Sequence, residues 1–100
     1  MNGHVMNLDR PREMRLSMRA ILLFEKTAGT TLGEAMERGS MRDMVALAWA
    51  GMHRDDRDLT VERLIDLVDE HMGVGAFMEE MGRALAAAMP QGAEGGAEGE

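Results

Sequence analysis

The stretch "SMRDMVALAWAGMHRDDRDLTVERLIDLVDE", residues 40–70, decides the fold class. Apolar residues recur along its first part at helical spacing, at Met41, Met44, Val45, Ala48 and Met52, widened by Leu47 and Trp49. The same period returns along its last part, at Val61, Leu64, Ile65 and Val68, and continues beyond it to Met72. Two amphipathic helices joined by a short charged turn are therefore predicted, and the chain is expected to be mainly α-helical.

The turn itself, His53–Asp58, carries residues that resemble two kinds of functional site. The tripeptide His53-Arg54-Asp55 opens the catalytic loop of protein kinases, but that loop needs an asparagine where Thr60 stands, and no glycine-rich loop accompanies it. A calcium loop beginning at Asp56 needs a glycine where Val61 stands. We therefore predict a hydrated inter-helix turn, followed by a helix that Thr60 caps.

Capping residues and glycines divide the rest of the chain into three further helices. Ser17 can cap one that stops at Gly29, with an apolar stripe of Met18, Ile21, Leu22 and Ala28, flanked by Phe24. Thr31 and Glu34 have capping-box spacing for a short helix ending at Gly39, and Ser40 caps the next. After Gly73 or Gly75, a last helix ends before Pro90 and carries Val74, Phe77, Met78, Met81, Leu85 and Met89.

The amino-terminal segment follows a different pattern. Apolar residues alternate at Met14, Leu16 and Met18, and Pro11 discourages a helix here, so a short strand or hairpin is predicted. The expected organisation is an extended segment or hairpin over residues 1–16, a helical domain over 17–89 and a flexible acidic Gly/Glu tail over 90–100. The fold class is thus an all-α bundle of about five short amphipathic helices with this amino-terminal addition.

Charge and composition restrict the functions that this chain can perform. The formal net charge is -7, and residues 55–100 alone carry twelve acids against three arginines. A duplex-binding protein needs a basic face, so nucleic acid is disfavoured as a partner, whereas a basic or polar protein is suitable. The chain contains no cysteine, and no apolar run predicts a secretory signal or a membrane span.

No pattern of reactive residues indicates an enzyme, a cofactor or a metal site. The histidines His4, His53 and His71 form no helical pair, and no nucleophile with a partnered base is visible. The stronger signal is twelve methionines in 100 residues, because methionine both fills cores and lines surfaces that bind varied apolar helices. Met36, Met52, Met72, Met81 and Met89 either belong to the core or line a groove that binds a partner.

Taken together, "LLFEKTAGTTL" and residues 40–70 resemble the tail assembly chaperones of long-tailed bacteriophages, prophages and gene transfer agents. The resemblance spans about residues 8–72. Its elements are a first helix with Phe24 and Glu25 that stops at Gly29, then a Ser40-capped helix that includes Trp49 and leads through the charged turn to Leu59-Thr60-Val61-Glu62.

This resemblance implies a non-enzymatic protein that binds the tape measure protein and keeps it soluble while the tail tube assembles. It also implies that the protein acts in the cytoplasm of the host bacterium and is absent from the mature virion. A frameshifted longer form is expected to recruit the major tail tube protein. Trp49 and Met52 are then expected to bind the tape measure protein or a second copy in a homo-oligomer. The alternatives are a prophage-encoded structural or connector protein, and a regulatory helical protein that blocks a partner.

Overall fold

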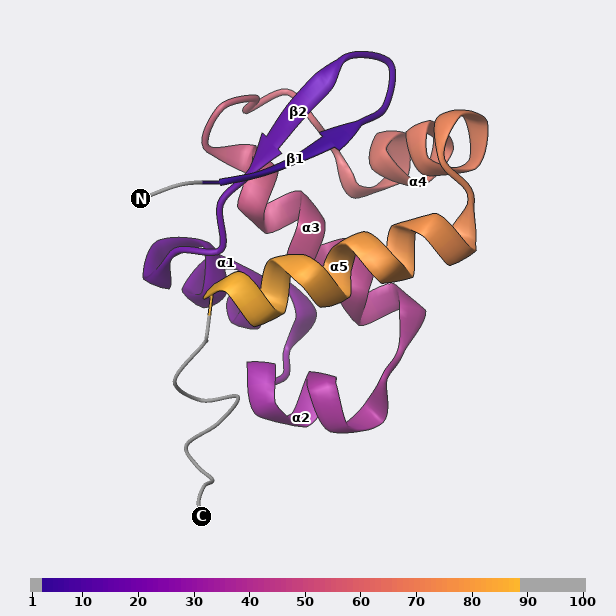
Figure 1. Ribbon diagram of the computed structural model, residues 1–100. Helices are drawn as coiled ribbons and strands as arrows, with labels where there is room; N and C mark the ends of the chain where they lie inside the picture. The colour runs from indigo at the N-terminus through magenta and orange to yellow at the C-terminus, as the bar shows by residue number, and fades with distance from the viewer. Residues whose placement is uncertain (1–2, 89–100) are drawn as a thin grey trace.

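The computed structural model describes residues 3–88 and confirms a small, mainly helical domain with an amino-terminal hairpin (Figure 1). The elements are β1 (His4–Asn7), β2 (Pro11–Met14), α1 (Met18–Ala28), α2 (Leu32–Arg38), α3 (Met41–His53), α4 (Val61–His71) and α5 (Val74–Ala88). The expected tail over residues 90–100, and the end of the last helix at Met89 and Pro90, lie outside the described residues.

Helix α3 is the centre of the domain. α1, β2, α4 and α5 all pack against it, and in Figure 1 α5 crosses in front of it. Buried residues occur all round α3 from Asp43 to Met52, with Trp49 as the half-buried exception, as expected for a helix enclosed by others. The largest fully buried side chains come from every layer round it and are Phe24, Phe77, Met6, Met14, Leu47, Met52, Leu64, Leu67 and Met81.

The helix ends follow the local signals in the sequence. The hydroxyls of Ser17, Thr31 and Thr60 each accept a hydrogen bond from a main-chain N–H in the first turn that follows. Gly29 and Gly39 adopt the left-handed conformation that ends α1 and α2. These three caps and two stops are confirmed predictions.

Ser40 departs from this pattern. It occupies the N-cap position of α3 but makes no side-chain cap hydrogen bond. Asp43, three residues on, is buried and accepts hydrogen bonds from Arg38 at 2.7 and 3.2 Å instead. An ion pair between the end of α2 and the first turn of α3 thus fixes this corner, where the helix dipole also favours the carboxylate.

The hairpin alternates inward and outward side chains, but over a shorter stretch than the sequence predicted. β1 and β2 are antiparallel with Met6 opposite Arg12 and His4 opposite Met14, and Met6, Arg12 and Met14 are buried. Pro11 begins β2 beside the turn, a position where a strand tolerates a proline. The alternation does not continue to Met18, which opens α1 and is 74% exposed.

The hairpin lies close against the end of α3 because Gly51 has no side chain. The N–H of Arg15 donates to the Gly51 carbonyl at 2.9 Å. A Cβ added at Gly51 would lie 2.5 Å from Cγ of Met14 and 3.3 Å from the main-chain nitrogen of Arg15. Glycine is therefore required here for a close approach, at a position with an ordinary helical backbone.

The apolar stripe predicted for α1 is only partly right, because Ile21 and Ala28 pack against the core but Met18 and Leu22 do not. The residues that α1 buries are Ala20 and Phe24, whereas Met18 and Leu22 are exposed. Phe24 has the largest apolar surface on the helix, and the small Ala20 lets the backbone approach α3. The rotation that buries these two side chains turns Met18 and Leu22 toward solvent.

Candidate functional site

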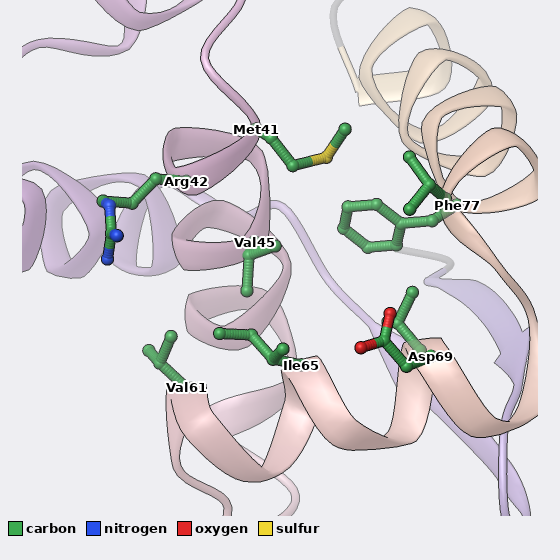
Figure 2. A pocket seen from close by; sticks show the side chains of 9 residues that line it. Met41, Arg42, Val45, Val61, Ile65, Asp69 and Phe77 are labelled. Atoms are coloured by element: carbon green, nitrogen blue, oxygen red, sulfur yellow. The ribbon is translucent and has the colours of Figure 1, made fainter.

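An apolar cleft lies where α3, α4 and α5 meet (Figure 2). Its volume is about 300 Å³, the lower end of the range typical of ligand pockets. Most of its wall is aliphatic or aromatic and consists of Met41 and Val45 from α3, Val61, Ile65 and Val68 from α4, and Val74 and Phe77 from α5. A cleft of this size and lining suits the apolar side chains of a partner.

Two exposed apolar residues lie at this cleft. Met41 is 40% exposed and Val74 is 55% exposed, while Val45 and Phe77 are buried beneath them. Figure 2 shows the Met41 side chain directed across the cleft toward Phe77. Because a partner could cover these side chains without unfolding any element, the cleft offers apolar surface that is already formed.

The polar residues of the cleft are one cation and one anion. Arg42 comes from α3 and Asp69 from α4, and neither forms an ion pair within residues 3–88. They lie on opposite sides of the view in Figure 2. An amphipathic helix seated in the cleft could therefore be oriented by a charge of each sign.

Two of the methionines for which core and partner groove were both open belong to the core. Met52 is 2% exposed and Met81 is 1% exposed, because α3 is enclosed and α5 directs Met81 toward it. Neither can contact a partner in this conformation, so the core alternative holds for both, and Met52 is not the partner-binding residue that the resemblance implied. Of the other candidates, Met36 is 46% exposed on α2, Met72 is half-buried after α4, and Met89 lies outside the described residues.

Trp49, the other candidate, serves the turn between α3 and α4. Its Nε1–H donates to the Leu59 carbonyl at 2.7 Å, and its ring lies against His53 with centroids 4.9 Å apart. The side chain is half-buried, with its polar atom already used. Trp49 thus holds the turn closed, and it does not line the apolar cleft.

The charged turn is more than a hydrated link, because the hairpin binds it. Arg12, only 8% exposed, donates to Asp56 at 2.8 Å and forms two hydrogen bonds with Asp9, at 2.9 and 3.1 Å. These bonds to Arg12 lower the pKa of Asp9 to about 2 and also lower the pKa of Asp56. The same contacts raise the pKa of Arg12, so the guanidinium stays charged between two carboxylates.

The described residues contain no group of three or more potential metal ligands. His4 contacts Glu80, which ties β1 to α5, and Glu80 also accepts from Arg83 at 3.2 Å. Glu25 accepts from the N–H of Leu32 at 2.9 Å and so caps α2 across the linker. The polar contacts of these residues hold elements together, and none of them forms a nucleophile–base arrangement.

Sequence reasoning placed Val61, Ile65 and Val74 in core stripes and missed that they line a cleft. The signal available was the width of the α4 stripe, whose five apolar residues exceed what one neighbouring helix covers. In the structure α4 buries only Leu64, Leu67 and Val68 fully, which leaves Val61 and Ile65 partly uncovered.

Over residues 3–88 no helix combines the length and the apolar character needed to cross a membrane. Comparison of the chain with models of protein families, with curated proteins and with solved structures finds no match.

Proposed function

We propose that this protein is a tail assembly chaperone of a long-tailed phage or prophage, which binds apolar helical segments of the tape measure protein. The observation that carries the proposal is the apolar cleft between α3, α4 and α5, with Met41 and Val74 exposed at it. Helix-in-groove recognition places the apolar face of an amphipathic helix in such a cleft. The resemblance of the sequence pattern to that family also supports the proposal, because the resembling segment includes α3 and α4, which form two of the three walls.

Such a chaperone works without catalysis. It needs an apolar surface that binds many similar helical segments, and a charge that keeps the complex dispersed. The cleft supplies the first, and the net charge of -7 supplies the second. The proposed place of action is the cytoplasm of the host bacterium, followed by release before the virion is complete. A longer frameshifted form would recruit the major tail tube protein.

The test is co-expression with the tape measure protein that, under this proposal, a neighbouring gene encodes. We expect the tape measure protein to move from the insoluble to the soluble fraction, and the two proteins to purify together. If its solubility is unchanged by the co-expressed chain, the proposal fails. Mass spectrometry of purified particles separates the alternatives, because a structural or connector protein remains in the virion whereas a chaperone is absent.

Substitutions at the cleft test its role directly. We expect Val74→Gln combined with Met41→Gln to weaken tape measure binding by about tenfold or more, since both half-exposed side chains would be covered in the complex. Val5→Gln is a matched control, because Val5 is 49% exposed on the hairpin, outside the cleft. If the double variant and the control bind the tape measure protein equally well, its binding site lies outside the cleft.

A further inference from the structure

A second, larger groove lies on a different part of the molecule, between α1 and the end of α3. Its volume is about 910 Å³. It is lined by five cationic side chains, which are Arg15, Arg19, Lys26, Arg54 and Arg57. No aspartate or glutamate is among its lining residues. Five of the eleven lysines and arginines of an acidic protein thus surround one groove.

The five cations differ in how closely carboxylates approach them, and Glu13 and Asp55 both act electrostatically on Arg15. Arg15 pairs with Glu13 at 2.9 Å, but the other four form no ion pair within the described residues. Arg15 also keeps a buried Nε without a hydrogen-bond partner there. The positive potential of the groove therefore remains available to an incoming anion.

The groove also contains the two most exposed large apolar side chains of residues 3–88. Met18 is 74% exposed and Leu22 is 57% exposed, and both lie on the outer face of α1. The half-buried Leu23 adds to the lining. Arg19 and Lys26 flank these residues on the same helix, so apolar contact and positive charge are offered side by side.

We propose that this groove binds an acidic amphipathic segment of a partner protein, a helix whose carboxylates flank an apolar stripe. Charge complementarity requires acidic groups on the ligand, and Met18 and Leu22 require apolar groups between them. The inference does not rest on the proposed function, because the groove and the apolar cleft share no lining residue.

Two other occupants fit the groove less well. A nucleic acid would leave the exposed methionine and leucine uncovered by apolar groups, and the groove offers no aromatic ring except His53 on which bases could stack. A second copy of this chain would bring two net charges of -7 together.

The test uses a fluorescein-labelled synthetic helix in which glutamates flank a leucine stripe, and the same helix with every glutamate replaced by glutamine. Fluorescence anisotropy with the full chain measures both affinities. We expect the glutamate helix to bind about tenfold more tightly or better. This advantage should disappear between about 0.1 M and about 1 M NaCl, where the Debye length falls from about 10 Å to about 3 Å.

Matched variants locate the binding to the groove. Arg19→Glu and Arg54→Glu should each weaken binding of the glutamate helix about tenfold. Arg63→Glu is the control, because it changes the net charge equally but lies on α4 outside the groove. Leu22→Ser should weaken binding of the glutamate helix about fivefold relative to the control Val5→Ser on the hairpin. All five residues are exposed, and circular dichroism checks that each variant folds.

Three results would overturn the inference. The glutamine helix could bind as tightly as the glutamate helix. A labelled single-stranded oligonucleotide could bind more tightly than the helix and lose affinity on Arg19→Glu, which would make the ligand a nucleic acid. Sedimentation of the protein alone could reveal an oligomer that Arg19→Glu dissociates, which would make the occupant a second copy. We expect the Val74→Gln variant to bind the glutamate helix unchanged, which would show that the helix occupies this groove and not the apolar cleft.

Discussion

Replacement of Gly51 by alanine tests whether close contact between the hairpin and α3 sets the stability of the domain. The new methyl group would lie 2.5 Å from Cγ of Met14 and 3.2 Å from Cδ2 of Leu16. It would also lie 3.3 Å from the main-chain nitrogen of Arg15, which donates to the Gly51 carbonyl. The hairpin must move away to accept the methyl group, and that movement weakens the hydrogen bond.

Two opposing effects determine the size of the change. Overpacking of a buried contact lowers the free energy of unfolding by about 1–3 kcal/mol. Replacement of glycine by alanine within a helix raises it by about 0.5–1 kcal/mol. Gly82 in α5 provides the control, because nothing lies within 4 Å of an added Cβ there. The Gly82→Ala variant should therefore show the helix effect alone.

The assay is urea denaturation of both variants followed by far-ultraviolet circular dichroism. We expect Gly82→Ala to be more stable than the natural chain, and Gly51→Ala to be about 1–3 kcal/mol less stable than Gly82→Ala. For a domain of this size, that difference lowers the melting temperature by about 4 °C or more. If both alanines raise stability equally, the hairpin is not held at the distance described, and the inferred role of Gly51 is wrong.

Three other perturbations have expected results. Thr60→Ala should lower the free energy of unfolding by about 1 kcal/mol and Ser40→Ala by less, because only Thr60 makes a cap hydrogen bond; equal losses in urea denaturation would contradict this. Trp49→Phe should lower the free energy of unfolding by about 1–3 kcal/mol, measured in the same way, because the buried Leu59 carbonyl loses its donor. An unchanged urea midpoint would show that water replaces the indole N–H. The folded-state pKa of Asp9 is depressed to about 2 from 3.8, so its contribution is present above about pH 4 and is lost as the pH falls toward 2. Acid titration of stability should therefore be shallower for Asp9→Asn, and identical titrations would exclude the ion pair.

The features that sequence predicted well are local ones. A cap or a stop depends on residues within one helical turn, so Ser17, Thr60 and Gly29 could be identified without knowledge of the fold. The orientation of α1 could not, because its apolar residues extend beyond a single face. The choice between Phe24 and Leu22 as the inward residue depends on how closely α3 can approach.

The polar contacts that fix the hairpin could not be predicted for a related reason. Arg12 and Asp56 are 44 positions apart in the chain, and nothing in either local sequence indicates the other. The apolar cleft and the groove likewise depend on the angles between packed helices. Charge counted along the chain placed Arg57 in the acidic segment 55–100, whereas the fold brings it to one groove with Arg15 and Arg19.

The methionines have a structural explanation that alters their functional meaning. The chain has only three aromatic residues of the Phe, Trp and Tyr types, so other large side chains must fill its core. Five methionines do so, at Met6, Met14, Met44, Met52 and Met81. A high methionine content is therefore not by itself a sign of a binding surface in this protein. In both proposals, binding depends instead on apolar side chains that packing leaves exposed. These include Met41 at the mouth of the cleft and Met18 on the outer face of α1.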